Sequence, residues 1–185
     1  MDRLRIRAVA RMVRAGGLIA YPTEAVYGLG CDPRNRDAVR RLLLLKRRPA
    51  HKGLILIAAD AAQLAPYMMP LSATEQARLD ASWPGPHTWL VPTPTATPRW
   101  LRGRHATLAV RVTAHPLAAA LCRACGHPLV STSANRSGRP ALRSARAVRI
   151  QLGRALDGLL PGPTGGAARP TAIRDLRSGQ QLRAG

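Results

Sequence analysis

The sequence contains no phenylalanine, and aromatic residues make up only 3% of its 185 residues. A hydrophobic core must therefore be built from Leu, Val, Ile and Ala. Hydrophobic residues still make up 46% of the chain, which excludes a globally disordered protein. The sequence shows no secretory segment and no apolar run of transmembrane length. We therefore expect a cytoplasmic protein with one domain over residues 1–185.

Acidic residues and lysines are both scarce. The chain has 9 acidic residues against 29 Lys and Arg, which gives a net charge of +20. Lysine occurs only at positions 46 and 52, so 29 − 2 = 27 of the basic residues are arginine. This excess indicates either a polyanionic partner, such as RNA or a nucleotide, or a general bias toward arginine. Because the arginines are scattered along the chain, both explanations remain open.

The three cysteines, Cys31, Cys122 and Cys125, do not suggest a disulfide framework. Cys122 and Cys125 form a single C-x-x-C, and a zinc site would need two more ligands, for which His127 is the only close candidate. We favour buried thiols in an Ala-rich helix and expect no metal site. The common phosphate-loop, dinucleotide, zinc-protease and serine-hydrolase motifs are all absent.

Hydrophobic periodicity and turn residues predict alternating helices and strands. We expect helices over residues 2–15, 37–45, 60–67, 72–83, 115–126 and 144–152. Strands are expected over residues 18–21, 54–58, 88–92 and 107–112, from residue 128, and as a pair over 170–175 and 181–185. Residues 93–105 and 161–166 resemble a surface loop and a flexible loop.

Lys46 and Arg48 lie where a Leu-rich helix ends and before a buried strand. An ammonium and a guanidinium two residues apart on a loop can turn toward one anion, and the pair suits a polyphosphate. The alternative is a solvated helix C-terminus, where cations are favoured by the helix dipole.

Three other segments concentrate polar groups. Thr23, Glu24 and Tyr27 lie on a turn beside a strand end, which is either a ligand site or an ordinary turn. Arg111 interrupts an apolar strand, so it lies at a sheet edge or faces a ligand. The third segment has five small polar residues within seven positions and forms an anion-binding nest or a plain turn: Ser131, Thr132, Ser133, Asn135 and Ser137.

Together these segments resemble the YrdC/TsaC family of L-threonylcarbamoyladenylate synthases. The matching motifs occur in family order over residues 8 to 185: Tyr-Pro-Thr-Glu-Ala-Val-Tyr-Gly-Leu-Gly at 21–30, Lys-x-Arg-Pro at 46–49, Pro-Gly-Pro-His-Thr at 84–88, Ala-Val-Arg-Val at 109–112, Ser-Ala-Asn at 133–135 and Leu-Arg-x-Gly at 182–185. The resemblance is to the short, single-domain form.

The resemblance implies a YrdC-like α/β (α+β) fold, with an open, twisted, mixed β-sheet, flanking helices and a large basic concave cavity. It implies that L-threonine, bicarbonate (or CO2) and ATP give threonylcarbamoyl-AMP and pyrophosphate. Mg2+ would be held through the ATP phosphates. Partner proteins of the TsaD, TsaB and TsaE type would transfer the threonylcarbamoyl group to adenosine 37 of tRNAs that read ANN codons.

The resemblance also implies roles for individual residues. The catalytic set would be Lys46, Arg48, Ser133 and Asn135. The ATP contacts would be Arg48, Lys52, Thr107, Ser133, Asn135, Thr171 and Arg183. The threonine site would be Thr23, Tyr27, Arg111 and Ser131.

The sequence departs from the family pattern at a few positions. Longer members often carry Asn and His around the strand after Lys-x-Arg, where this chain has Lys52 and Ile57. Thr171 stands where Ser is usual, and it keeps the hydroxyl. Two alternatives remain open: a non-catalytic RNA-binding module of the same fold, which would bind tRNA or double-stranded RNA directly, and a related carbamoyl-adenylate activity on another substrate.

Overall fold

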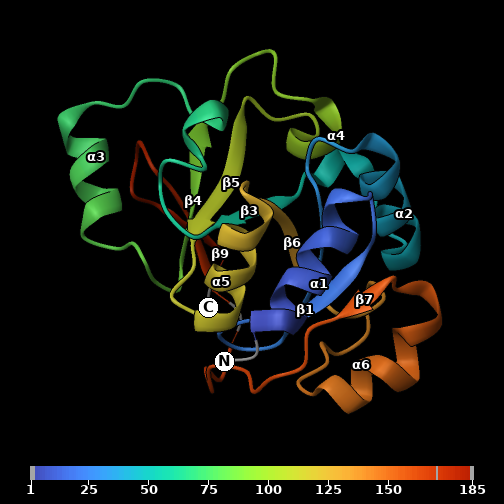
Figure 1. Ribbon diagram of the computed structural model, residues 1–185. Helices are drawn as coiled ribbons and strands as arrows, with labels where there is room; N and C mark the ends of the chain where they lie inside the picture. The colour runs from blue at the N-terminus through green and yellow to red at the C-terminus, as the bar shows by residue number, and fades with distance from the viewer. Residues whose placement is uncertain (1–2, 170, 184–185) are drawn as a thin grey trace.

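The computed structural model describes residues 3–169 and 171–183, which form an open mixed β-sheet with helices on both faces (Figure 1). Within that range the sheet has nine strands in the order β7-β1-β2-β6-β3-β5-β4-β8-β9. The strands are β1 (Ile19–Pro22), β2 (Tyr27–Cys31), β3 (Ile55–Ala58), β4 (His87–Pro92), β5 (Thr107–Val112), β6 (Leu129–Ser133), β7 (Gly158–Leu159), β8 (Ala172–Asp175) and β9 (Gln181–Arg183). The β1–β7, β3–β5 and β4–β8 pairs are parallel and the others antiparallel, which confirms the expected mixed sheet.

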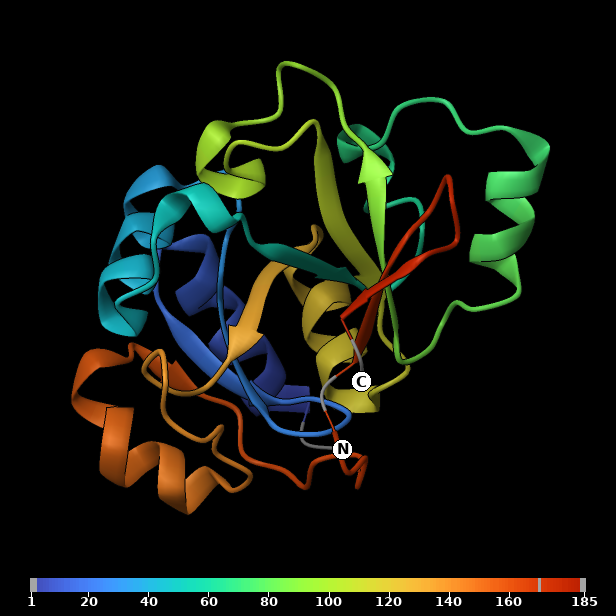
Figure 2. The same ribbon diagram turned by 180° about the vertical axis from the view of Figure 1, so that it is seen from behind.

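Two hydrophobic cores lie on opposite faces of the sheet, because successive side chains of a strand point to opposite sides. On one face Ile57 and Leu129 pack with α1 (Arg3–Arg14) and α5 (Pro116–Cys125), which lie side by side in Figures 1 and 2. On the other face Leu56 and Val130 pack in the core that includes residues of α2 (Arg36–Lys46), α3 (Ala73–Asp80), α4 (Arg99–Arg102) and α6 (Ala145–Leu152). Aliphatic residues dominate both cores, as expected for a chain without phenylalanine.

Several helix ends follow the local signals in the sequence. The Ser72 hydroxyl accepts from the backbone N–H of Glu75, and the Glu75 carboxylate accepts from the backbone N–H of Ser72, so the two residues form a capping box at the start of α3. His115 caps the N-terminus of α5, and Gly126, with a φ of 78°, ends that helix in the left-handed conformation.

Some predicted elements were wrong. The helix expected over residues 60–67 is reduced to a 3-10 turn, η2 (Ala65–Tyr67). The Asp60 carboxylate accepts from the backbone N–H of Gln63, and the Gln63 side chain bonds Ala59 and Cys122, so side-chain contacts hold a non-helical turn. Residues 93–105, expected to form a surface loop, contain helix α4. The polar turn that follows Pro22 leads directly into strand β2, which was not expected.

The C-terminal strand pair is confirmed over β8 and β9, while residues 170 and 184–185 of that prediction lie outside the described residues. The remaining 3-10 turns are η1 (Ala50–Lys52) and η3 (Gly153–Ala155). No helix within the described ranges is long and apolar enough to span a membrane.

Candidate functional site

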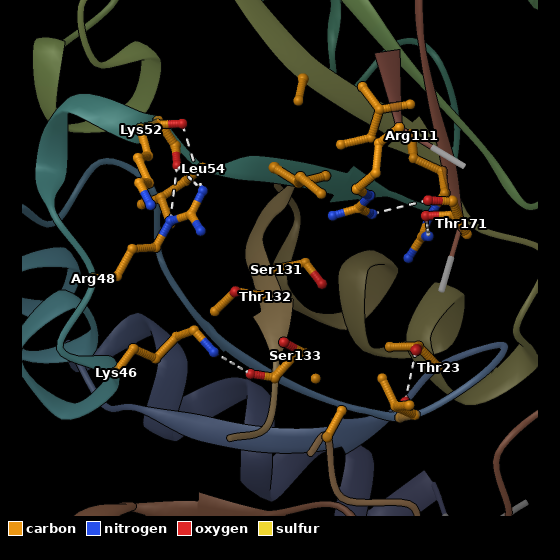
Figure 3. A pocket seen from close by; sticks show the side chains of 18 of the residues that line it. Thr23, Lys46, Arg48, Lys52, Leu54, Arg111, Ser131, Thr132, Ser133 and Thr171 are labelled. Atoms are coloured by element: carbon orange, nitrogen blue, oxygen red, sulfur yellow. Dashed lines mark hydrogen bonds between the residues drawn. The ribbon is translucent and has the colours of Figure 1, made fainter. Parts of the chain in front are cut away.

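A cavity of about 660 Å3 lies on the sheet around the ends of β2, β3, β5 and β6 (Figure 3). It is bordered by residues from distant parts of the chain. All twelve residues predicted for the site line it: Thr23, Tyr27, Lys46, Arg48, Lys52, Thr107, Arg111, Ser131, Ser133, Asn135, Thr171 and Arg183. Among the described lining residues there are six Lys or Arg side chains and one carboxylate, Glu24.

The end of helix α2 directs two cations into this cavity. Arg47 has φ 52° and ψ 43°, and the backbone N–H groups of Arg47 and Arg48 donate to the carbonyls of Leu44 and Leu43. This is a Schellman-type ending with Arg where Gly is usual. The left-handed residue reverses the chain, so Lys46 and Arg48 line the cavity while Arg47 is exposed and does not.

Lys46 is almost fully buried and bonds only to neutral oxygens. Its Nζ donates to the carbonyls of Ser133 (2.5 Å) and Asn135 (2.9 Å) and to the Asn135 side-chain oxygen (2.9 Å). Burial and the nearby Arg48 charge lower the pKa of Lys46 to about 8. Three acceptors require three N–H donors, so the geometry selects the ammonium form at neutral pH.

The Ser-x-Asn segment is arranged around this ammonium. The Ser133 hydroxyl donates to the Asn135 side-chain oxygen at 2.7 Å, and the Asn135 amide donates to the carbonyl of Arg139. The backbone N–H of Ser137 donates to the Lys46 carbonyl at 2.9 Å. The Lys-x-Arg and Ser-x-Asn motifs, 87 residues apart at Lys46 and Ser133, therefore form one hydrogen-bonded unit.

Arg48 is held against the chain that follows it. Its Nε and Nη2 donate to the Gly53 carbonyl at 3.2 and 2.9 Å. This contact closes the loop through η1 and keeps the guanidinium beside the exposed Lys52 at the rim of the cavity (Figure 3). Ile57, the second position at which the sequence departs from the family pattern, lies in the core and does not line the cavity.

Arg111 faces the cavity from the interior of the sheet. Strand β5 lies between β3 and β4, so the alternative of a sheet-edge arginine is excluded. Arg111 Nη1 donates to the Thr171 hydroxyl at 2.8 Å, and Nη2 lies 3.3 Å from Glu24 Oε2. Burial alone would raise the pKa of Glu24, but the Arg111 charge and the Thr113 hydroxyl outweigh it and hold that pKa below its usual value. Glu24 is therefore ionised at neutral pH.

The hydroxyls of Thr23 and Tyr27 already have backbone partners. Thr23 Oγ1 donates to the Val26 carbonyl at 2.7 Å within the turn between β1 and β2. Tyr27 Oη donates to the Gly162 carbonyl at 2.6 Å and accepts from the Gly162 N–H at 3.0 Å. These two residues thus shape the wall of the cavity, whereas Ser131, on the central strand β6, extends into it (Figure 3).

Steric contacts require glycine at positions 28 and 30 of the Tyr-Gly-Leu-Gly motif. A Cβ at Gly30 would lie 2.6 Å from the Val130 carbonyl oxygen and 2.8 Å from the ring of Tyr21. A Cβ at Gly28 would also contact the Tyr21 ring. Tyr21 is fully buried, so its ring requires glycine on the neighbouring strand β2.

The loop over residues 161–168, which includes the 161–166 segment expected to be flexible, is tied to the cavity wall. The N–H groups of Gly165 and Ala167 donate to the carbonyls of Thr23 and Glu24 at 3.0 and 2.9 Å. His115 Nε2 lies 3.1 Å from the Pro163 carbonyl. The loop thereby brings Thr171 and Arg183 to Arg111, and Arg183 Nη2 donates to the Thr171 carbonyl at 2.9 Å.

Some lining residues were missed by sequence reasoning. Glu24 was noted as polar but given no role, and Thr113, which lies behind the lining and bonds Glu24, was not considered. Thr132 belongs to the small polar segment but was given no role, and three other lining residues carried no distinctive sequence signal: Leu54, Arg102 and His105.

The cysteines lie away from the cavity lining and are buried. Burial raises the pKa of Cys125 to about 11 and the pKa of Cys122 further, which leaves both thiols protonated and unreactive. His127 pairs with Asp32 at 3.3 Å rather than with the two cysteines. The residues that the structure describes contain no group of three or more His, Cys, Asp or Glu placed to hold a metal ion.

The fold and the cavity define an α/β protein with a cation-lined site on an open mixed sheet. The sequence model of the Sua5/YciO/YrdC family, described as telomere recombination, matches residues 11–185. The chain is 59% identical over 179 residues to the threonylcarbamoyl-AMP synthase of Nitrosococcus oceani, with 97% of each chain covered. It is 60% identical over 179 residues to the enzyme of the same name from Halorhodospira halophila, with 97% of this chain and 94% of that one covered.

A solved structure shares the fold closely. The crystal structure of P. abyssi Sua5 complexed with L-threonine superimposes with a TM-score of 0.89 at 32% identity. The match covers 95% of this chain and 52% of that one, so the chain spans about half the length of that structure. The chain belongs to the Sua5/YciO/YrdC family.

Proposed function

We propose that this protein is an L-threonylcarbamoyladenylate synthase, a nucleotidyltransferase that makes threonylcarbamoyl-AMP and pyrophosphate from L-threonine, bicarbonate or CO2, and ATP. The observation that carries this proposal is the pairing of two kinds of site in one cavity. At one end Lys46 holds an ammonium without a carboxylate partner in the described chain, and at the other Arg111 holds a guanidinium beside Glu24. The relatives that share almost the whole length of the chain carry the same activity in their names.

The chemistry needs positioning and positive charge more than a protein nucleophile. The threonine amine attacks CO2, forms a C–N bond and loses one proton; from bicarbonate the same step releases water. A carbamate oxygen then attacks the α-phosphorus of ATP, and the bond to the bridging oxygen of pyrophosphate breaks. Because charge develops on phosphoryl oxygens, fixed cations and hydrogen-bond donors lower the barrier.

The cavity supplies such groups in the proposed arrangement. Lys46 and Arg48 hold the phosphates and the carbamate, while Ser133 and Asn135 bind ATP and fix the Lys46 ammonium. Arg111 binds the threonine carboxylate, and the remaining threonine contacts are Thr23, Tyr27 and Ser131. The rest of the nucleotide pocket is Lys52, Thr107, Thr171 and Arg183.

In the proposed reaction Mg2+ is bound to ATP and not to protein ligands. The one carboxylate among the described lining residues is Glu24, and both of its oxygens face Arg111 or Thr113. The donor set of the cavity therefore does not suit a protein-held magnesium ion, which prefers carboxylates. The ion would travel on the ATP phosphates.

The product is an activated intermediate for N6-threonylcarbamoyladenosine at position 37 of tRNAs that read ANN codons. Its use requires transfer proteins of the TsaD, TsaB and TsaE type, and the place of the reaction is the cytoplasm, where tRNA is modified. The proposed functional unit is the single domain of residues 1–185.

The test is pyrophosphate release from ATP and Mg2+, with L-threonine or bicarbonate omitted in turn. Release that needs both substrates supports the proposal. Release that is independent of threonine would contradict it and would favour a related carbamoyl-adenylate activity.

A second candidate function, direct RNA binding, is favoured by exposed arginines in the segment that follows the cavity-lining Ser-x-Asn motif: Arg136, Arg139, Arg143, Arg146 and Arg149. Contacts to phosphates predict that the affinity for tRNA or double-stranded RNA falls steeply with salt concentration. An affinity that hardly changes between low and moderate salt would exclude electrostatic binding.

A further inference from the structure

Glu24 is a largely buried acid in a cavity whose other charged lining residues, among those described, are Lys and Arg. It lies on the turn between β1 and β2, and its side chain is 12% exposed. Oε2 faces Arg111 Nη2 at 3.3 Å, and Oε1 accepts from Thr113 Oγ1 at 2.6 Å. Burial of a carboxylate is costly unless a partner offsets it, so this contact is a built feature of the site.

Both oxygens of the carboxylate are already engaged by protein groups, Oε2 by Arg111 and Oε1 by Thr113. Glu24 Oε2 is inaccessible to solvent and has no hydrogen-bond partner beyond its ion pair with Arg111. Thr113 is itself fixed, because its hydroxyl accepts from the backbone N–H of His115 at 3.2 Å. Glu24 therefore acts on a bound molecule through Arg111 and not by direct contact.

Arg111 is held from two sides by parts of the chain that are far apart in sequence. Glu24 holds one end of the guanidinium from the β1–β2 turn, and Thr171 accepts from the other end at 2.8 Å. A guanidinium fixed in this way presents its remaining donors in one orientation. Preorganised donors lose less conformational entropy when they bind a carboxylate.

Glu24 also makes the two ends of the cavity differ in charge. Lys46 and Arg48 make no ion pair with a carboxylate within residues 3–169 and 171–183, whereas the Arg111 charge is balanced by Glu24. A polyphosphate is attracted more strongly to the first end, because the Glu24 carboxylate lowers the positive charge of the second. A zwitterionic amino acid carries no net charge, so its ammonium offsets the repulsion that its carboxylate meets from Glu24 near Arg111.

We propose that Glu24, held by Thr113, is a positioning and specificity-determining residue that orients Arg111 for an α-amino acid carboxylate and keeps phosphate groups out of that end of the cavity. The inference rests on the proposed function, since it names the end of the cavity that threonine occupies.

The test is calorimetric titration of the full-length protein with L-threonine in the presence of bicarbonate, and separately with ATP and Mg2+. Glu24→Gln keeps the shape of the side chain and removes its charge, and we expect the dissociation constant for threonine to rise at least about tenfold. The dissociation constant for ATP should stay within about twofold of the wild-type value. Pyrophosphate should compete with threonine in this variant but not in the wild type.

Thr113→Val is the second variant, because it removes one hydrogen bond to Glu24 and leaves the ion pair in place. We expect a smaller loss of threonine affinity in the same direction. In the Glu24→Gln background the Thr113→Val change should add little, because Thr113 acts through the carboxylate. Glu75→Gln, which alters a remote carboxylate on α3, is the matched control and should change neither affinity.

The outcomes separate the inference from the proposed function. Equal threonine binding by the wild type and both variants would overturn the role of Glu24 alone. A wild type that binds no threonine would overturn the role of Glu24 and the proposed function together. If Glu24→Gln and Thr113→Val each lose as much affinity for ATP as for threonine, the ion pair only supports the structure of the cavity. That result would also overturn the role of Glu24.

Discussion

Lys46 carries a buried charge that only neutral oxygens surround. Its three acceptors are two backbone carbonyls and the side-chain oxygen of Asn135. These oxygens stabilise the ammonium without neutralising it, so the charge remains available to an anion. Arg48 lies two residues away and faces the same cavity. At the scale of single residues, this pair is the centre of the proposed phosphate site.

Replacing either cation with alanine should lower turnover. We expect Lys46→Ala or Arg48→Ala to reduce kcat/KM for ATP at least about tenfold, or about 1.4 kcal/mol of transition-state stabilisation. Circular dichroism should show that both variants remain folded. Arg47→Ala is the control, because Arg47 lies between them and does not line the cavity. Near-normal turnover in both variants would remove these cations from the mechanism.

The affinity for ATP should depend on pH through Lys46. Burial and the Arg48 charge lower the pKa of Lys46 to about 8 in the free protein. The ammonium is present below that pH and is lost as the pH rises through it, so ATP binding should weaken above about pH 8. Titrations with ATP between pH 7 and 9.5 measure this change. A wild-type profile with the same alkaline slope as that of Lys46→Ala would contradict the assignment.

The residues of the site could be predicted to different extents. Lys46 and Arg48 follow from their spacing at a helix end, and the small polar residues of 131–137 stand out by composition. The role of Glu24 could not be inferred, because it depends on Arg111, 87 residues further along the chain. Nor does the sequence show that the Tyr27 hydroxyl is occupied by Gly162, since that contact also joins distant segments.

Among the helices and strands, local sequence signals predicted the capped helices well. They predicted less well the glycine-rich strand β2 and the segment 60–67, which side-chain hydrogen bonds hold in a turn. No strand was expected over β2, because Pro22 ends the preceding strand and Gly28 and Gly30 allow tight backbone, yet the buried Tyr21 ring requires glycine at both positions. Residues 60–67 have an apolar helical pattern, but hydrogen bonds of Asp60 and Gln63 hold a different turn. In both segments contacts with neighbouring elements overrode the local propensity.

The end of α2 should be stabilised by a glycine. Arg47 has a φ of 52°, which costs a residue with a Cβ about 1 kcal/mol or more. Glycine removes this cost but makes the unfolded chain more flexible, which offsets part of the stabilisation. Arg47→Gly should therefore raise the free energy of unfolding by about 0.5–1 kcal/mol. Urea denaturation measures the change, and turnover should be unaltered. Arg47→Ala keeps the Cβ and should show no comparable gain; equal stability of the two variants would contradict this account.

At the scale of the whole molecule, the cavity is assembled from both ends of the chain. The β1–β2 turn, the end of α2, strands β5 and β6 and the C-terminal strands all contribute lining residues (Figure 3). The 161–168 loop joins these parts, because it bonds Thr23, Glu24 and Tyr27 before the chain reaches Thr171. The motifs in the sequence therefore predict residues that line the cavity, but not how the loop joins its parts.

Loss of the Tyr27 hydroxyl should loosen this assembly. Tyr27→Phe leaves both the N–H and the carbonyl of Gly162 without their partner, and we expect a loss of about 1–3 kcal/mol in the free energy of unfolding. The loop should also be cleaved faster in limited proteolysis. Unchanged stability and cleavage would show that the loop is held without Tyr27.

In the proposed reaction one cavity joins threonine, bicarbonate and the adenylyl group of ATP. The most direct measurement is mass spectrometry of the nucleotide product made from 13C-bicarbonate, 15N-threonine and ATP. The account predicts an adenylate whose mass carries both labels, with an equal amount of pyrophosphate. An adenylate that lacks the bicarbonate carbon, or pyrophosphate without any labelled adenylate, would contradict it.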